Sequence, residues 1–416
     1  MSAGDWRRPF FALWSGQAVS LFGSALVQFA LIWWLTQTTG SATVLATASL
    51  AGLLPQVVLG PVAGVVVDRA SRRLVMIAAD SLVALFTLGL ALLFWADLAQ
   101  IWHVYVILLA RSLAGALHFP AMQASTALMV PEAQLARVAG FNQTLQAGMG
   151  IVAPPVGALL LGLLPMQGVL AIDVVTAVVG MAPLFVVRVP RPPARPAGAA
   201  KPTFMADLVA GLRYVAGWPG LAIILAMAAV INLLLTPAGS LIPILVTRHF
   251  RGAAGELAVM ESAFSLGLVI GGLVLGLWGG VKSRIITSLL GLAGLGLGTL
   301  VIGWAPADMF WVAVAGSFGM MFMNAMTNGP LFALLQATVA PEMQGRVFTL
   351  IGSLSALMAP VGLLAAGPVA DSLGVQIWYQ LGGLACLLMS ALAAALPAVR
   401  NLEARRSAVA APVAAD

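Results

Sequence analysis

The stretch "GPVAGVVVDRASRRLVM", residues 60–76, decides how the rest of this chain is interpreted. An apolar run stops, and four charged residues follow within the next six positions: Asp68, Arg69, Arg72 and Arg73. The sequence then becomes apolar again. A short, mostly basic segment between two apolar runs is typical of a cytoplasmic loop that joins two membrane-spanning helices.

The composition of the whole 416-residue chain agrees with this interpretation. Hydrophobic residues make up 61% and charged residues only 8%, whereas soluble domains carry roughly 25% charged residues. Apolar stretches of about 20 residues recur along the chain, and each can cross about 30 Å of hydrocarbon as a helix. Helices satisfy their own backbone hydrogen bonds, as hydrocarbon requires. The sequence therefore predicts an all-α integral membrane protein.

Twelve transmembrane helices are expected, and they divide into two six-helix bundles. The expected spans are about 10–36, 43–67, 74–95, 101–126, 138–163, 167–187, 219–246, 257–281, 285–304, 308–337, 347–368 and 375–397. The expected organisation is an N-terminal bundle (1–187), a cytoplasmic linker (188–217), a C-terminal bundle (218–399) and a cytoplasmic tail (400–416).

The distribution of basic residues predicts the orientation. The chain has 20 Lys and Arg residues, and with the N-terminus inside only Arg111, Arg248 and Arg251 lie outside the cytoplasmic segments, which leaves 17 within them. Lys and Arg concentrate on the cytoplasmic side of membrane proteins. Both termini are therefore expected in the cytoplasm, with the protein in the cell inner (cytoplasmic) membrane.

The linker is rich in proline and basic residues ("RVPRPPARPAGAAKPT", 188–203), a composition typical of a semi-extended segment. After it, Phe204, Leu208, Leu212 and Val215 recur at helical spacing. Two interpretations stay open. The segment is either a short amphipathic helix at the inner membrane surface or an early start of the seventh span.

The two halves of the chain contain similar stretches in the same order. "VPEAQLARV" (130–138) matches "APEMQGRVF" (340–348), and "VAPPVGALLLG" (152–162) matches "MAPVGLLAAG" (358–367). Gly60 and Gly64 match Gly272 and Gly276 at a constant offset of 212 residues (272 minus 60). Internal repeats of half the chain length are typical of secondary transporters.

These features resemble the major facilitator superfamily. The opening stretch is similar to the loop signature between its second and third helices, and Arg111-x-x-x-Gly115 is similar to an element of its drug/proton antiporters. "FALWSGQAVSLFGSALVQFALIWWLTQTTGSATVL" (11–45), "VPEAQLARVAGFNQTLQ" and "GRVFTLIGSLSALMAPVGLLAAG" resemble the macrolide-efflux (Mef-type) members. The resemblance implies the major facilitator fold. In the second copy of the loop, "GLWGGVKSRII", Gly280 stands where the first copy has Asp68.

The resemblance implies that the basic loop is an inner latch, which closes the cytoplasmic side and opens during transport. The implied latch residues are Asp68, Arg69, Arg72, Arg73 and Arg346. For Arg72 and Arg73 an alternative is an anchor to anionic lipid headgroups. An acid adds nothing to such an anchor, so the alternative does not explain Asp68.

Charges inside the membrane are costly and indicate functional sites. Arg111 and Asp173 lie about 21 to 22 Å from the inner ends of their helices, at 1.5 Å per residue, so they can pair. Such a pair is either structural or a proton switch, since protonation of the acid removes the attraction. Asp80 and Glu261 are further candidates for proton coupling. The alternative for Asp80 is an ion pair with the loop arginines. The alternative for Glu261 is a solvated carboxylate without a role in coupling. His118 either relays protons or is a hydrogen-bonded packing residue.

Polar side chains in the spans are candidates for substrate binding. Helices 1, 4, 7 and 10 line the cavity in the superfamily, so the resemblance implies a site that includes Gln28, Phe29, Asn232, Asn324 and Asn328. No nucleophile–base or metal cluster is apparent, and the single cysteine and three scattered histidines give no ligand spacing. We expect no enzyme activity, no metal and no cofactor.

The leading functional hypothesis is proton-coupled secondary active efflux of bulky lipophilic compounds, macrolide-type antibiotics first, by alternating access. Expected partners are a small lipophilic substrate, protons and the lipid bilayer, with no nucleic acid, and the protein is expected to be a monomer. Export of an endogenous metabolite such as a siderophore, or lipid flipping, is the alternative within transport. A channel and an integral membrane enzyme are alternatives from other classes.

Overall fold

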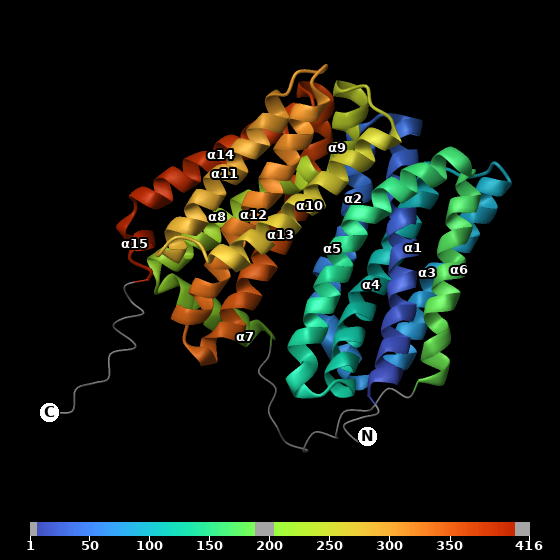
Figure 1. The fold of residues 1–416 in the computed structure, drawn as a ribbon, viewed down its shortest axis with the longest axis horizontal. Helices are drawn as coiled ribbons and strands as arrows, with labels where there is room; N and C mark the ends of the chain where they lie inside the picture. Colours follow the sequence, from blue (N-terminus) through green and yellow to red (C-terminus); the bar gives the residue numbers. More distant parts are fainter. Residues whose placement is uncertain (1–5, 188–203, 404–416) are drawn as a thin grey trace. The chain divides into compact units, whose positions relative to one another are not determined.

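A computed structural model describes residues 6–187 and 204–403 of the chain, and within these ranges it leaves out the side chains of 61, 65, 68, 69, 204–208, 210, 341 and 342. The described residues are helical, with no strand among them (Figure 1). The long helices are α1 (Arg7–Thr39), α2 (Ala42–Arg69), α3 (Arg72–Trp95), α4 (Ile101–Met129), α5 (Glu132–Leu163), α6 (Met166–Val186), α8 (Pro219–Ser240), α10 (Ala254–Trp278), α11 (Arg284–Trp304), α12 (Phe310–Thr338), α13 (Pro341–Leu373) and α14 (Gln376–Ala395). Twelve described helices are long and apolar enough to cross a membrane, as the sequence predicts.

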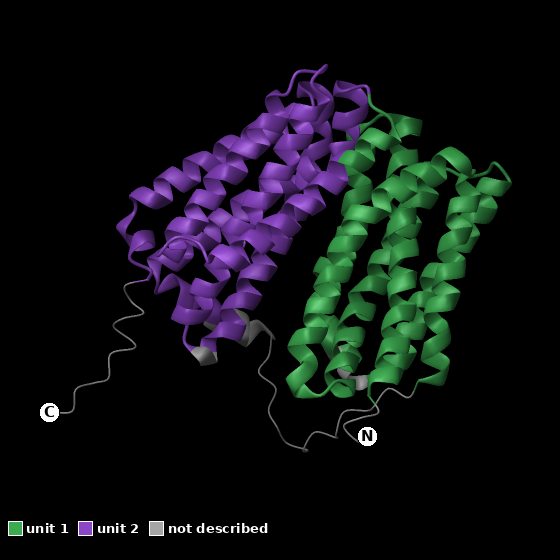
Figure 2. Cartoon of the chain, in the orientation of Figure 1, with its two compact units in different colours: residues 1–199, 252–259 green, residues 200–251, 260–416 purple. Residues whose placement is uncertain are grey.

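The chain forms two compact units, coloured separately in Figure 2. The first consists of residues 1–199 and 252–259, and the second of residues 200–251 and 260–416. The first unit contains α1 to α6, and the second contains the remaining helices except the start of α10. Residues 188–203 of the expected linker (188–217) lie outside the described residues, so the expected domain boundaries stay a prediction.

The helices pair in the same order inside each unit. In the first unit, α1 packs on α5 and α6, α3 packs on α4 and α6, and α2 packs on α4. In the second unit, α8 packs on α13 and α14, and α11 packs on α12 and α14. A Cβ at Gly267 of α10 would lie 2.2 Å from the carbonyl oxygen of Phe318 on α12, so these two helices also touch. The packing therefore repeats every six spans, in agreement with the repeated sequence stretches.

Close backbone approach packs α11 against two helices of the second unit. A Cβ at Gly298 would lie 2.6 Å from the backbone nitrogen of Met320 on α12. A Cβ at Gly296 would lie 2.8 Å from the carbonyl oxygen of Gly383 on α14. Small residues let membrane helices approach closely and gain van der Waals contact. The glycine-rich sequence of α11 therefore serves packing against two neighbours.

The two loops related by the sequence repeat have different backbones. Helix α2 continues through Asp68 and ends at Arg69. Helix α10 ends earlier, at Trp278, and both Gly279 (φ 76°) and Gly280 (φ 82°) have left-handed backbone conformations. Residues other than glycine rarely adopt such φ values. Gly280 replaces the acid because this turn requires glycine.

The seventh expected span, 219–246, contains an interruption that was not predicted from the sequence. Helix α8 stops at Ser240 and is followed by the short α9 (Ile242–Ile244) and the π-helix η1 (Leu245–His249). Proline removes a backbone donor, and Pro237 and Pro243 flank the break at Leu241. In η1 the Phe250 nitrogen donates to the Leu245 oxygen at 3.2 Å, which is an i→i+5 bond.

A separate helix, α7 (Phe204–Ala216), precedes the second bundle. It is divided from α8 by Gly217 and Trp218, so the segment is not an early start of the seventh span. Helix α7 packs on α13, where a Cβ at Gly211 would lie 3.2 Å from the carbonyl oxygen of Arg346. A position at the inner membrane surface stays a prediction.

Candidate functional site

The first unit contains a hollow of about 780 Å³, which we call the charged hollow. Its walls come from α1, α3, α4 and α5, with Ala177 from α6. Most of the lining is apolar, including the rings of Trp14 and Phe119. Its ionisable lining residues are Asp80, Arg111 and His118. Ligand sites are commonly apolar cavities with a few polar groups of this kind.

Arg111 of α4 and Asp173 of α6 form a buried ion pair. The distance from Arg111 Nη1 to Asp173 Oδ2 is 2.6 Å, and their side chains are 10% and 1% exposed. Ser24 Oγ donates to Asp173 Oδ1 at 3.0 Å, and Thr87 Oγ1 donates to Oδ2 at 3.2 Å. Arg111 Nη2 donates to the Ser24 carbonyl oxygen at 2.9 Å. The pair therefore joins α1, α3, α4 and α6 through one polar network.

This geometry makes the pair sensitive to the charge of Asp173. Both carboxylate oxygens accept hydrogen bonds, so the ionised form is well satisfied. Removing one partner of a buried pair leaves an uncompensated charge and costs about 3–5 kcal/mol. Protonation of Asp173 would likewise remove the attraction that holds the guanidinium. The arrangement can therefore couple a proton to the packing of four helices.

Asp80 of α3 lies in the same hollow with different partners. Gln17 Nε2 of α1 donates to Asp80 Oδ2 at 3.1 Å and to the Gly180 carbonyl oxygen of α6 at 3.1 Å. His118 Nε2 of α4 lies 3.3 Å from Asp80 Oδ1. Among the described side chains, the partners of Asp80 are thus Gln17 and His118, and not the loop arginines Arg72 and Arg73.

The expected latch is described only in part. The side chains of Asp68 and Arg69 lie outside the described residues, so the interpretation of Asp68 stays a prediction. Arg72 Nη1 donates to the Ala124 carbonyl oxygen of α4 at 2.8 Å, and Arg73 Nη2 donates to the Phe185 carbonyl oxygen of α6 at 2.8 Å. These two arginines tie the start of α3 to the ends of two neighbouring helices.

Arg346 was expected just before the eleventh span, but α13 already begins at Pro341. Arg346 therefore lies in the second turn of the helix, where its Nη1 is 3.6 Å from the sulfur of Met343. The sequence repeat at 340–348 marks the helix start, because Ala340-Pro341 supplies the proline that helices favour in their first turn. The expected boundary at 347 is corrected to 341.

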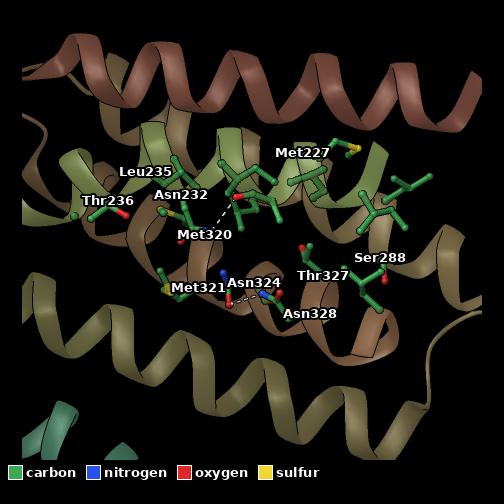
Figure 3. Close-up of a pocket in the computed structure, with 18 of the residues that line it drawn as sticks. Met227, Asn232, Leu235, Thr236, Ser288, Met320, Met321, Asn324, Thr327 and Asn328 are labelled. Carbon is green, nitrogen blue, oxygen red and sulfur yellow. Dashed lines mark hydrogen bonds between the residues drawn. The ribbon is translucent and has the colours of Figure 1, made fainter. Parts of the chain in front are cut away.

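The second unit contains its own hollow of about 400 Å³, which we call the amide hollow (Figure 3). It is lined by Asn232 of α8 and by Asn324 and Asn328 of α12, three of the residues expected to bind substrate. Asn328 Nδ2 donates to Asn324 Oδ1 at 3.2 Å, and Asn232 Nδ2 donates to the Ala228 carbonyl oxygen at 2.9 Å. The methionines Met227, Met320 and Met321 supply a flexible apolar wall.

The sequence did not indicate Ser288 of α11, which also lines the amide hollow. Its side chain is 4% exposed, and its Oγ is a buried atom without a hydrogen-bond partner among the described residues. Buried hydroxyls are normally paired. Ser288 Oγ is therefore available to a ligand in this hollow.

Three other expected site residues, Gln28, Phe29 and Glu261, do not line either hollow. Gln28 is exposed, and Phe29 is buried on α1, where a Cβ at Gly157 of α5 would lie 2.9 Å from its ring. Glu261 is half-buried on α10 and does not line the amide hollow. Hydropathy gives the depth of these residues but not the helix face, so the sequence could not place them.

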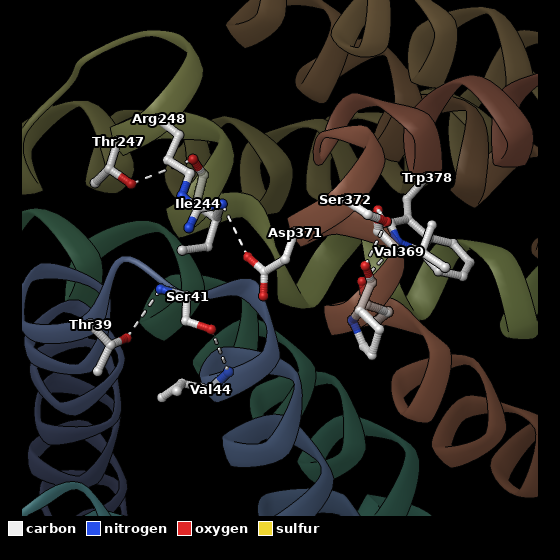
Figure 4. A network of polar contacts seen from close by, with 12 residues as sticks. Thr39, Ser41, Val44, Ile244, Thr247, Arg248, Val369, Asp371, Ser372 and Trp378 are labelled. Carbon is white, nitrogen blue, oxygen red and sulfur yellow. Dashed lines mark hydrogen bonds and ion pairs between the residues drawn. The ribbon is translucent and has the colours of Figure 1, made fainter.

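Polar contacts at the ends of the spans fix local geometry (Figure 4). In the first unit, Ser41 Oγ caps α2 by accepting from the Val44 nitrogen at 3.4 Å. In the second unit, Arg248 Nη1 lies 3.1 Å from Asp371 Oδ1, with side chains 48% and 31% exposed. Exposed pairs contribute little stability, whereas loss of one partner from a buried pair such as Arg111–Asp173 is costly.

Comparisons with known proteins agree with this architecture. Residues 13–238 match the family described as "Major Facilitator Superfamily". Macrolide efflux protein A of Streptococcus pyogenes is 35% identical over 399 residues, which cover 96% of this chain and 98% of that protein. The multidrug efflux pump Tap of Mycolicibacterium fortuitum is 28% identical and covers 92% of this chain and 94% of its own. The solved nucleoside transporter NupG has a TM-score of 0.72 at 12% identity, covering 93% of this chain and 98% of that one, which shows the fold alone.

Proposed function

Because the chain belongs to the Major Facilitator Superfamily, we propose that it exports bulky lipophilic compounds, macrolide-type antibiotics first, in exchange for protons. The observation that carries the substrate class is the near full-length similarity to a macrolide efflux protein. The two hollows support it, since both combine apolar walls with a small number of polar groups.

The Arg111–Asp173 pair supports proton coupling. It is the most buried ion pair among the described residues, and Arg111 lines the charged hollow. In the proposed cycle, a proton on Asp173 releases the guanidinium of Arg111, and the helices joined by the pair repack. Loss of the proton restores the pair. Alternating access uses two such packings that differ by a few kcal/mol.

The orientation forms part of the same proposal. The excess of Lys and Arg in the expected cytoplasmic segments favours a protein of the cytoplasmic membrane with both termini inside. Asp68 and its neighbouring arginines are proposed to act as the latch on that side. The protein is proposed to work as a monomer.

A susceptibility panel in a pump-deficient host tests this function. Expression of the wild-type chain should raise resistance to macrolides, and a protonophore should remove the increase. The matched control is the Asp173→Asn variant expressed to the same level in the membrane. Unchanged macrolide susceptibility with the wild-type chain would remove the substrate assignment, and resistance that survives the protonophore would remove the proton coupling.

A further inference from the structure

The charged hollow contains a carboxylate, that of Asp80, with no Lys or Arg partner among the described side chains. Asp173 is neutralised by Arg111 at 2.6 Å. Asp80 has no cation of its own among the described side chains, because its partners are the neutral amide of Gln17 and the imidazole of His118. When Asp80 is ionised and His118 is neutral, the negative charge of Asp80 is therefore not balanced by a neighbouring cation among the described side chains.

The surroundings of Asp80 leave room for a ligand. Its side chain is 12% exposed and lines the hollow. Although His118 Nε2 is 3.3 Å from Oδ1, it is a buried atom without a hydrogen-bond partner among the described residues. An unpaired charge at membrane depth is costly. A cation that enters the hollow would lower that cost.

The rest of the lining specifies what kind of cation fits. The walls are mostly apolar, and Trp14 and Phe119 place aromatic rings in the same hollow as Asp80. Aromatic faces attract organic cations, most strongly where water is excluded. A small hydrated metal ion would gain little from such walls. We propose that Asp80 is the counter-ion for the ammonium group of a lipophilic amine substrate, and that protonation of His118 expels this substrate. This inference rests on the proposed efflux function and names the chemical class of its substrate.

The charged groups around Asp80 come from the helices that pack on α3. Helix α2 is one of them, and the side chains of its charged residues Asp68 and Arg69 lie outside the described residues. Helix α4 contributes His118 and Arg111, and α6 contributes Asp173, which Arg111 already pairs. Helix α1 contributes the neutral Gln17. On α3 itself, Arg72 and Arg73 donate to backbone carbonyls of α4 and α6. Within the described part of the hollow, His118 is the group free to change the charge beside Asp80.

Protonation of His118 and binding of the substrate cation are expected to oppose each other. Histidine changes its charge in the physiological pH range. A neutral His118 leaves Asp80 free for the substrate cation, whereas a proton on the imidazole gives Asp80 a cation and weakens substrate binding. Linkage makes this reciprocal, so bound substrate also opposes the proton. Acid on the outer side would therefore promote release there, with one proton taken up by His118 for each substrate cation released.

Equilibrium binding of tetraphenylphosphonium, a permanent lipophilic cation, tests the inference on the purified full-length protein in lipid nanodiscs. Affinity for the wild type should fall at least about tenfold from mildly alkaline to mildly acidic pH. Asp80→Asn should weaken binding at alkaline pH at least about tenfold, as expected for losing a buried charge partner. His118→Gln should lose the pH dependence, so that its affinity differs by less than about twofold between the two pH values. The control, Asp97→Asn, makes the same substitution in an exposed loop and should change nothing.

The outcomes separate the inference from the proposed function. Undiminished binding by a folded Asp80→Asn protein, or pH dependence that persists in His118→Gln, would overturn the inference. If Asp80→Asn does not fold, the His118→Gln profile alone decides. A macrolide whose amine has been converted to an uncharged amide serves as the neutral probe, and its export should not depend on Asp80. Export of the neutral probe without any binding of the cation would remove the inference and leave efflux intact, and export of neither would remove efflux itself.

Discussion

The Arg111–Asp173 pair gives a stability prediction that can be worked from its geometry. Two unit charges 2.6 Å apart attract by about 6 kcal/mol at an effective dielectric constant near 20, before desolvation is subtracted. Because both side chains are at least nine-tenths buried, solvent screening is small. Arg111→Ala should therefore destabilise the folded protein by about 3–5 kcal/mol, mainly through the carboxylate that it leaves unpaired.

A double-mutant cycle separates the pair from its surroundings. Asp173→Asn keeps the shape of the side chain and one acceptor oxygen for Ser24, while an amide donor replaces the oxygen that accepts from Thr87. If the charges interact as the structure shows, the double variant should be less destabilised than the sum of the single variants by about 1–3 kcal/mol. The free energy of unfolding is measured by titration with sodium dodecyl sulfate in mixed micelles and followed by tryptophan fluorescence.

The chain offers a matched control for this cycle. Arg248 and Asp371 form an Arg–Asp pair at 3.1 Å, but their side chains are far more exposed. The cycle of Arg248→Ala with Asp371→Asn should give a coupling energy below about 1 kcal/mol. Additivity of the Arg111 and Asp173 substitutions to within about 0.5 kcal/mol would refute the reasoning, as would equal coupling in both cycles.

Three further predictions concern the loops and helix ends. Gly280→Asp should not restore a second latch but should destabilise the protein by about 1–3 kcal/mol, since φ is 82° there; Gly255→Asp, at an exposed glycine, is the control, and equal melting temperatures would contradict the prediction. Glu403→Gln should lower stability by about 1 kcal/mol, because Glu403 Oε1 accepts from the Arg284 and Ile285 nitrogens at the start of α11; thermal unfolding that matches the wild type would argue against this cap. Asp68→Asn should slow efflux while cytoplasmic substrate still binds, and an unchanged transport rate would reduce Asp68 to an ordinary loop charge.

Much of the fold follows from the sequence because only helices and closed β-barrels can span the hydrocarbon region of a membrane. An apolar run such as residues 10–36 can satisfy its backbone hydrogen bonds in the membrane only as a helix. The sequence therefore predicted this helix and placed its ends within a few residues of those of α1. The interruption after Ser240 was not predicted from the sequence, although Pro237 and Pro243 lie close to it. Proline inside a spanning helix is often tolerated, and only tertiary packing decides whether the helix kinks or stops.

The sequence predicted how far along each helix the candidate site residues lie, but not which face of the helix carries them. The sequence predicts similar depths for Arg111 and Asp173, and the structure brings their side chains to 2.6 Å. Gln28 and Gln17 are both polar residues of α1, yet Gln17 reaches Asp80 and Gln28 is exposed. A spanning helix that is apolar on all sides gives no signal for its rotation about its own axis. The face that lines the hollow is therefore decided by packing against neighbouring helices. Ser288 gave no signal, because a single serine in a span is usually bonded to its own helix.

Gradient-driven transport in proteoliposomes tests the central claim most directly. The purified wild-type protein and Asp173→Asn are reconstituted at equal density, a pH gradient is imposed, and accumulation of a radiolabelled macrolide is followed. Wild-type vesicles should accumulate the macrolide against its gradient and lose this ability when the pH gradient is collapsed. Asp173→Asn should bind the macrolide but accumulate none, and full gradient-driven accumulation by this variant would contradict the assignment of the proton to Asp173.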